Sequence, residues 1–202
     1  MNDLFASPLP DVNTQQNVTV GRFRAGDRAE LDFYETPAEA TRALLERHPS
    51  LLFKPILEPC AGNGAISKVV QEFGGTVESW DITEREFPLD GVWNFLSGEG
   101  KEDDANIITN PPYEHALPFI RKSLAMVLPG NHVCFLLRVL FLEGIERRKL
   151  FDEHPPAEVA VFSKRIHCPR AYGGNAEGSN AMSFAWFIWR KGHTGKTTLT
   201  WV

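Results

Sequence analysis

The order of hydrophobic and polar positions predicts alternating strands and helices from about residue 36 onward. Short apolar runs bounded by turn residues are typical of buried strands, and apolar residues repeated every three or four positions indicate amphipathic helices. By these criteria we expect strands at 56–57, 76–81, 105–109, 133–137, 159–162 and 182–189, and helices at 37–48, 65–73, 115–128 and 142–151. Because strands that alternate with helices form a parallel sheet covered on both faces, the pattern predicts an α/β fold.

The first 30 residues lack this periodicity. They combine prolines, glycines and an Asn/Gln/Thr cluster, so we expect a flexible N-terminal arm over residues 1–30 and a single domain over 31–202. The first helix is expected to open with a capping box, in which Thr36 is the N-cap, Pro37 the first helical residue and Glu39 the third.

Composition and charge restrict the functional classes. The chain has 202 residues, 43% of them hydrophobic and 23% charged, which is typical of a folded soluble domain. With a formal net charge of −5, any contact with nucleic acid requires a local basic patch. The longest apolar stretch, residues 133–142, is broken by Arg138 and is shorter than the ~20 residues of a membrane span. The N-terminus does not resemble a signal peptide, so we expect a cytoplasmic location. Three widely separated cysteines predict neither a metal site nor disulfides.

Two features at predicted strand ends point to a cofactor. Residues 58–64, Glu-Pro-Cys-Ala-Gly-Asn-Gly, connect a strand to a helix, and their glycines let the backbone approach a ligand closely. Asp81 ends the next strand about 20 residues later, where a carboxylate can accept hydrogen bonds from a ribose. Each feature alone also fits an ordinary turn or a surface aspartate. Together they indicate a cofactor that contains adenosine.

The segment at 110–113, Asn-Pro-Pro-Tyr, suggests the chemistry. Two prolines after a strand remove backbone donors and fix the turn, so the Asn110 amide and the Pro111 carbonyl become rigid acceptors. Two such acceptors hold an amino group in place and leave its lone pair to face an electrophile. Tyr113 offers a flat surface on which a planar group can stack. The alternative is a proline-terminated strand with a solvated asparagine.

These segments resemble class I S-adenosylmethionine-dependent methyltransferases. Residues 58–64 resemble their cofactor loop, and Asn-Pro-Pro-Tyr is the signature of amino methyltransferases, chiefly DNA adenine N6 enzymes. Residues 32–37 are similar to the family's Tyr-x-Thr-Pro segment and residues 94–96 to its Asp-Phe-Leu segment. The cofactor loop precedes the Asn-Pro-Pro-Tyr segment, which is the gamma order of the family's motifs. The resemblance covers about residues 32–202 and is nearest to small phage and prophage DNA adenine methylases, which have a similar Ala-Trp-Phe-Ile-Trp strand after a glycine-rich loop and a similar tail to residues 197–201.

The resemblance implies a Rossmann-like methyltransferase fold, with a mostly parallel central sheet, helices on both faces and an antiparallel C-terminal strand. It implies S-adenosyl-L-methionine as cofactor, S-adenosyl-L-homocysteine as product, and transfer to the N6 amino group of adenine in DNA after base flipping. The catalytic residues would be Asn110, Pro111, Pro112 and Tyr113. The cofactor residues would be Tyr34, Thr36, Pro37, Glu58, Pro59, Cys60, Ala61, Gly62, Gly64, Asp81, Ile82, Asn94, Phe95 and Asn110. Asn94 stands where the family usually has aspartate, so its amide oxygen would bind the adenine amino group.

No separate target-recognition domain is expected, so nucleic acid must be held by the catalytic domain itself. The resemblance to phage and prophage enzymes implies a location in the cytoplasm of a bacterial host cell. The candidates are cationic or aromatic residues that follow the fourth and fifth predicted strands: Arg147, Arg148, Lys149, Lys164, Arg165, His167, Arg170 and Tyr172. The long loop that contains the last three has the length of a functional loop. Simple solvation of these charges is the alternative.

Other acceptors fit the same signature. It also occurs in methyltransferases that act on RNA adenine or on the glutamine amide of release factors, and the acidic composition fits a protein acceptor. A third interpretation is a phage accessory protein that binds the cofactor without catalysis, against which the intact Asn-Pro-Pro-Tyr segment argues.

Overall fold

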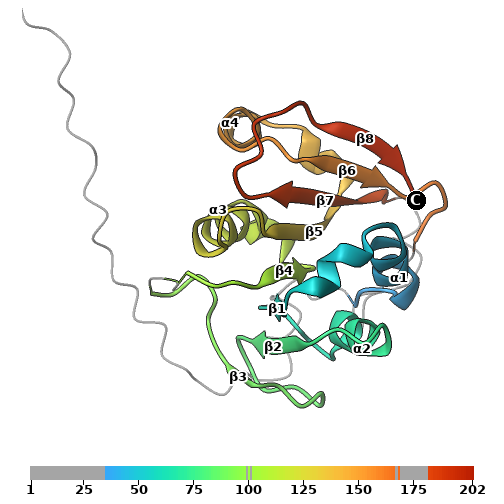
Figure 1. The fold of residues 1–202 in the computed structure, drawn as a ribbon, viewed down its shortest axis with the longest axis vertical. Helices are drawn as coiled ribbons and strands as arrows, with labels where there is room; N and C mark the ends of the chain where they lie inside the picture. The colour runs from blue at the N-terminus through green and yellow to red at the C-terminus, as the bar shows by residue number, and fades with distance from the viewer. Residues whose placement is uncertain (1–34, 99, 101, 167, 169–181) are drawn as a thin grey trace, which may run out of the picture.

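The computed structural model describes residues 35–98, 100, 102–166, 168 and 182–202. Its described residues contain an eight-stranded sheet in the order β3-β2-β1-β4-β5-β7-β6-β8 (Figure 1). The strands are β1 (Ile56–Glu58), β2 (Val77–Asp81), β3 (Gly91–Val92), β4 (Asn106–Thr109), β5 (His132–Arg138), β6 (Glu158–Val161), β7 (Phe184–Arg190) and β8 (Thr198–Trp201). The helices are α1 (Ala38–Arg47), α2 (Ala65–Glu72), α3 (Ala116–Met126) and α4 (Ile145–Glu153), with short 3₁₀ helices at η1 (Pro49–Phe53), η2 (Tyr113–His115) and η3 (Val139–Leu142).

The sheet is mostly parallel. β1 pairs in parallel with β2 and β4, β4 with β5, and β2 with β3, whereas β7 runs antiparallel between β5 and β6. The predicted fold class is therefore confirmed. Two strands were not predicted, the two-residue β3 and the outer strand β8, which pairs in parallel with β6.

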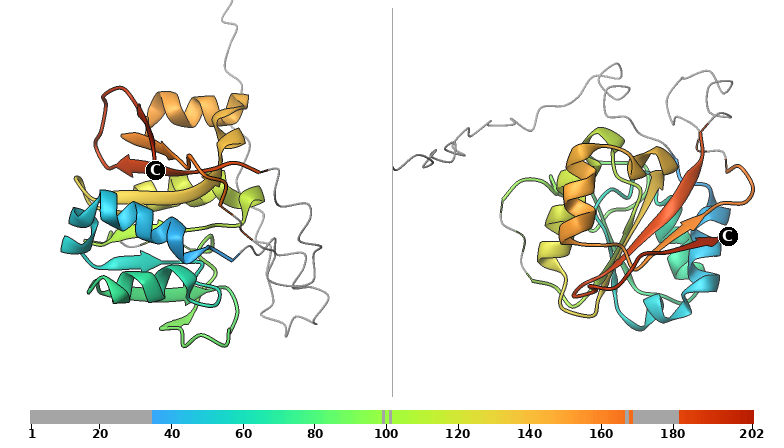
Figure 2. Two further views of the ribbon diagram at one scale, coloured as in Figure 1. Left: turned by 90° about the vertical axis from the view of Figure 1, so that its right-hand side faces the viewer. Right: turned by 90° about the horizontal axis from the view of Figure 1, so that it is seen from above.

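Helices cover both faces of the sheet (Figures 1 and 2). β5 shows why, because its side chains alternate between two cores. Phe135 and Leu137 belong to the core shared with α3 and α4, whereas Cys134 and Leu136 belong to the core shared with α1 and α2. All four are at most 1% exposed, so a polar substitution in this strand would disturb one core or the other. A continuous apolar run is what a strand buried on both faces requires.

Two helix starts differ from the prediction. Pro37 is the N-cap of α1 and no side chain caps that helix, so the predicted capping box is wrong. The Thr36 hydroxyl accepts a hydrogen bond from the Asn110 amide nitrogen instead. α4 begins at Ile145 rather than near 142, because Gly144 has a φ of 118°, a left-handed conformation that interrupts the helix.

The carboxyl ends of the parallel strands share one edge of the sheet. The chain leaves β1 on one side towards β2 and later returns on the other side as β4, so the strand order reverses between β1 and β4. In open α/β sheets such a switch point is where ligands bind. No helix in the described ranges is long and apolar enough to span a membrane.

Candidate active site

The predicted site segments meet at the switch point between β1 and β4. A cavity of about 10 Å³, large enough for one water, is lined by Glu35, Thr36, Glu58, Cys60, Ala61, Asn63, Ala65 and Asn110. The structure thus brings together the start of α1, the loop after β1 and the residue after β4. A ligand larger than water enters only if neighbouring side chains move.

Asp81 connects the loop after β1 to the end of β2. Its Oδ2 accepts a hydrogen bond from the Gly62 backbone N–H at 2.9 Å, and its Oδ1 lies 3.2 Å from Nη2 of Arg85. The Asp81 and Arg85 side chains are only 6% and 5% exposed. Asp81 is therefore a buried, hydrogen-bonded carboxylate, and the alternative of an ordinary surface aspartate is wrong.

The segment after β2 covers the glycine loop. Gly64 has a φ of 74°, and a Cβ built at this glycine would lie 2.3 Å from the Phe87 ring. The Lys68 ammonium lies over the same ring, 5.4 Å from its centroid. Asp90 fixes the far end of the segment, since its carboxylate accepts a hydrogen bond from the Ser79 N–H at 2.7 Å. Phe87 thus occupies the surface that a glycine leaves open for a ligand.

Glu58 is a buried acid at the end of β1. It is 1% exposed, and its carboxyl group accepts a hydrogen bond from the Ser67 hydroxyl, which lies 2.7 Å from the Ser79 hydroxyl. Burial raises the pKa of Glu58 to about 8, against the lowering effect of the Ser67 hydrogen bonds. Glu58 is therefore mostly protonated at neutral pH. Burial also raises the pKa of the Cys60 thiol well above its usual value, so this cysteine is not a thiolate nucleophile.

Asn110 follows β4 and faces the start of α1. Its Nδ2 donates a hydrogen bond to the Thr36 hydroxyl oxygen at 3.1 Å. Thr36 is 6% exposed, so this contact is shielded from water. The bond directs the NH₂ half of the amide at Thr36 and thereby sets the direction of the carbonyl oxygen, the half that accepts hydrogen bonds.

Tyr113 begins η2 beside the end of β5 and the start of β7. Its ring lies 6.1 Å from the Phe184 ring, and the Arg138 guanidinium lies 5.8 Å from its centroid. Arg138 is not among the residues that the sequence pattern predicted for the site, yet its guanidinium lies beside Tyr113. Its position in the sequence could have indicated this, because a cation directly after the apolar residues 133–137 lies at the end of a buried strand.

The cofactor candidates after β2 and β3 divide between half-buried positions and the core. Asn94 Oδ1 accepts the Leu96 N–H at 3.1 Å, and Ile82 is half-buried directly after Asp81. Phe95 is 2% exposed and stacks on Phe119 of α3 with centroids 5.0 Å apart. Contact of these residues with a cofactor stays a prediction, as it does for Pro37 and Pro59. Tyr34 lies outside the described residues.

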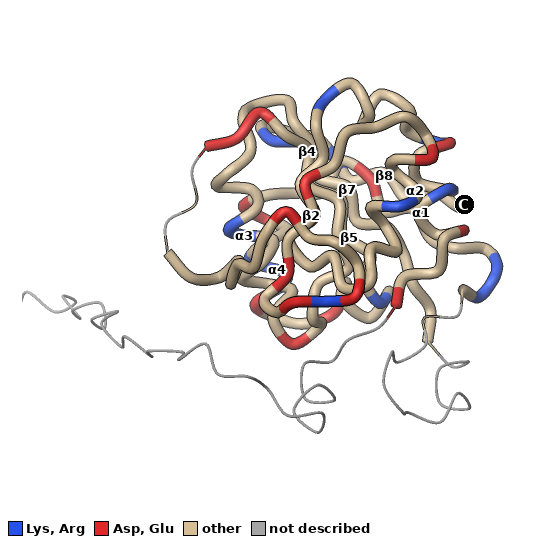
Figure 3. Tube along the Cα trace, turned by 90° about the horizontal axis from the view of Figure 1, so that it is seen from below, with Lys and Arg blue, Asp and Glu red and all other residues tan. Residues whose placement is uncertain are grey.

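The predicted nucleic-acid residues of α4 engage neighbours in the helix or its preceding turn. Arg148 pairs with Asp152 at 2.8 Å and Lys149 with Glu146 at 2.7 Å, while Arg147 donates to backbone carbonyls, including that of Leu140 at 3.1 Å. Cations and acids are interspersed over the described part of the chain (Figure 3).

Lys164 and Arg165 are exposed shortly after β6, at the same edge as Asn110. His167, Arg170 and Tyr172 lie outside the described residues. Nucleic-acid binding by this set stays a prediction.

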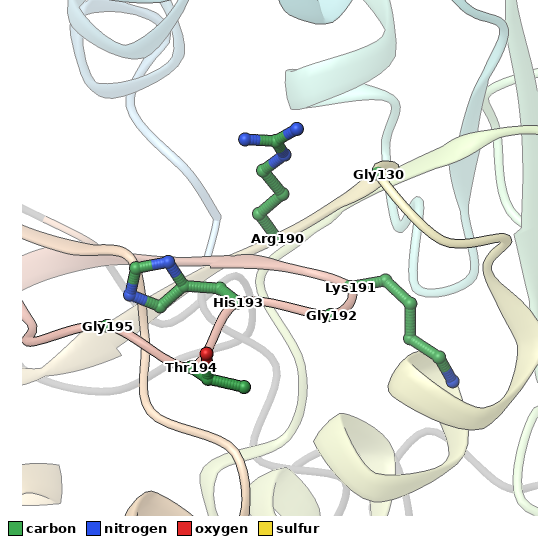
Figure 4. A pocket seen from close by; sticks show the side chains of 7 residues that line it. All are labelled: Gly130, Arg190, Lys191, Gly192, His193, Thr194 and Gly195. Carbon is green, nitrogen blue, oxygen red and sulfur yellow. The ribbon is translucent and has the colours of Figure 1, made fainter.

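A second hollow, of about 340 Å³, lies at the opposite edge of the sheet, where β7 ends and β5 begins. Its polar side chains include Arg190, Lys191 and His193, which point in different directions (Figure 4). The Lys191 ammonium donates to the Leu124 carbonyl rather than into the hollow. We assign no ligand to it, because its polar groups do not converge.

No protein-family model matches the sequence, and no curated protein sequence matches it. Solved structures with the same fold include a Listeria monocytogenes protein assigned to the class I S-adenosylmethionine-dependent methyltransferases (TM-score 0.59, 11% identity, 83% of this chain and 66% of that one). A methyltransferase subunit of a type I restriction-modification system from Streptococcus thermophilus has a TM-score of 0.56 at 13% identity, over 80% of this chain and 46% of that one. A Pyrococcus horikoshii protein assigned as an RNA methyltransferase has a TM-score of 0.57 at 14% identity, over 81% of this chain and 89% of that one. The chain thus has the Rossmann-like methyltransferase fold, and it spans less than two thirds of the first two proteins.

Proposed function

We propose that this chain is an S-adenosylmethionine-dependent methyltransferase that methylates the N6 amino group of adenine in DNA. The observation that carries the proposal is the single cavity that Asn110 lines together with Glu58 and Cys60. In this arrangement an amide acceptor at the end of β4 adjoins a glycine loop after β1, so an acceptor amino group and a cofactor would meet there once neighbouring side chains move.

The residues present fit this cofactor. Gly64 provides a surface that any Cβ would fill, once the Phe87 ring moves aside. Asp81 places a buried carboxylate where ribose hydroxyls could donate hydrogen bonds, and Glu58 places a second acid near the centre of the site. A cationic ligand beside Glu58 would favour its ionised form. Bound there, S-adenosylmethionine supplies a methyl group already activated by the sulfonium.

The chain's own residues then have to position the acceptor rather than provide a strong nucleophile. The Asn110 carbonyl oxygen and the Pro111 backbone carbonyl would each accept a hydrogen bond from the adenine amino group. Thr36 would keep the Asn110 amide in this orientation. Tyr113 would stack on the base, which must be turned out of a duplex at a cost of about a few kcal/mol.

The structural neighbours support a nucleic-acid acceptor. One is named as a restriction-modification methyltransferase and another as an RNA methyltransferase. RNA adenine is therefore the second candidate acceptor. A protein glutamine amide, or binding of the cofactor without catalysis, would be outcomes of the test below.

The test compares labelled methyl incorporation into DNA, RNA and a glutamine-containing release-factor peptide. DNA should be methylated, and Asn110→Ala should abolish transfer while the affinity for S-adenosylhomocysteine, measured by calorimetry, changes little. Turnover retained by Asn110→Ala would refute the assignment of this side chain. Incorporation only into RNA or the peptide would replace DNA as the acceptor.

A further inference from the structure

Arg138 differs in its contacts from the described arginines and lysines that form ion pairs. Seven arginine or lysine side chains among the described residues pair with a carboxylate: Arg42, Arg47, Lys54, Arg85, Arg121, Arg148 and Lys149. In the same described residues, the Arg138 guanidinium contacts the Met182 sulfur, 3.0 Å from Nε, and the face of the Tyr113 ring, and it contacts no carboxylate. Within the described residues, its positive charge therefore has no carboxylate partner.

The two contacts of Arg138 are easily exchanged. A thioether sulfur is a weak hydrogen-bond acceptor, and a cation–π contact near the surface is a weak interaction. A phosphate, by contrast, accepts two parallel hydrogen bonds from a guanidinium, with full charge assistance. An anion that reached Arg138 would therefore displace both present contacts.

The location of Arg138 beside the proposed acceptor site indicates which anion it can bind. Arg138 ends β5, next to β4 in the sheet, and so lies at the same edge as Asn110. Its guanidinium lies against the ring that we propose as the stacking surface for the target base. A phosphate bound there belongs to the target nucleotide or its immediate neighbour.

We propose that Arg138 binds a backbone phosphate beside the target base and thereby selects a polynucleotide acceptor. This inference rests on the proposed function, which it deepens by naming the acceptor class. As the base stacks on Tyr113, the guanidinium leaves the ring and takes the phosphate. A glutamine side chain carries no phosphate, so a protein acceptor would gain nothing from Arg138.

The test compares Arg138→Gln and Arg138→Lys with Arg42→Gln, which removes one surface cation from α1, where Arg42 pairs with Glu72 of α2. Binding of an adenine-containing oligodeoxynucleotide is measured by fluorescence anisotropy from 50 to 300 mM salt, together with kcat and KM for methyl transfer and the affinity for S-adenosylhomocysteine. Arg138→Gln should weaken oligonucleotide binding about tenfold or more and reduce the salt slope by about one phosphate contact. Arg138→Lys should keep the salt slope and recover part of the affinity, because lysine retains the charge without the fork.

Equal oligonucleotide affinity and salt slope in Arg138→Gln and the wild-type chain would overturn the inference. So would an equal loss in Arg42→Gln, which would make the effect one of net charge. Failure of the proposed function is a separate result, in which the wild-type chain transfers no methyl group to any nucleic acid. If Arg138→Gln melts too low to assay, Arg138→Lys decides. A reduced salt slope in Arg138→Lys, which retains the positive charge, would contradict the phosphate contact.

Discussion

Replacing Glu58 by glutamine should remove a large pH dependence of stability. In the folded protein, burial raises the pKa of Glu58 to about 8 from its ordinary value of 4.5. The folded state therefore keeps a proton on Glu58 over a pH range in which the unfolded chain has released it. Glutamine is close in shape to the protonated acid and cannot ionise, so Glu58→Gln should fold like the protonated form at every pH.

The sign and size follow from proton linkage. A pKa raised on folding contributes stability that is fully present below pH 4.5 and is lost as the pH rises to about 8. A difference of about 3.5 pKa values corresponds to about 5 kcal/mol at most, of which about 4 kcal/mol is lost between pH 5 and pH 8.5. Because Glu58 is 1% exposed, solvent screening reduces this figure little.

The assay is urea unfolding of both proteins at pH 5, 6, 7, 8 and 8.5. The free energy of unfolding of the wild-type chain minus that of Glu58→Gln should fall steadily across the series, since contributions from all other groups cancel in the difference. Glu72→Gln, on the exposed surface of α2 where Glu72 pairs with Arg42, is the matched control and should give a nearly constant difference. A constant difference for Glu58→Gln would show that this acid is ionised in the folded protein.

Two further predictions concern the surroundings of the site. Thr36→Val removes the acceptor of the Asn110 amide, so kcat should fall about tenfold, the value of one buried hydrogen bond, and Thr36→Ser should restore it. Steady-state kinetics test this, and an unchanged kcat in Thr36→Val would contradict a positioning role. Phe87→Ala uncovers Gly64, so the affinity for S-adenosylhomocysteine should rise about threefold or more, because the ring no longer has to be displaced. Calorimetry measures this, and equal or weaker binding would show that the ring does not compete with the ligand.

Much of the fold could be predicted because its strands are buried on both faces. β5 and β7 appear as continuous apolar runs, and a run of that kind has few alternatives in a chain that also contains amphipathic helices. β8 could not be predicted in this way. Three of its four residues, among them Leu199 and Trp201, are exposed, so no alternation of buried and exposed positions marks it as a strand. β3 is only two residues long, which is below what any periodicity can show.

The candidate site could likewise be predicted only in part. The loop after β1 and the Asn-Pro-Pro-Tyr segment could be placed at one edge because each directly follows a parallel strand, and topology alone brings such ends together. Contacts between segments distant in sequence do not follow from topology. Thr36 suits a helix cap by its local sequence, yet its hydroxyl bonds Asn110, 74 residues away. Arg138 interrupts an apolar run, yet its guanidinium meets the ring of Tyr113. In both cases the polar group contacts a residue distant in sequence, at the sheet edge where we propose that the acceptor binds. The local rules therefore fail at the residues to which we assign positioning, and the pairs Thr36–Asn110 and Arg138–Tyr113 are where substitutions should separate acceptor positioning from cofactor binding.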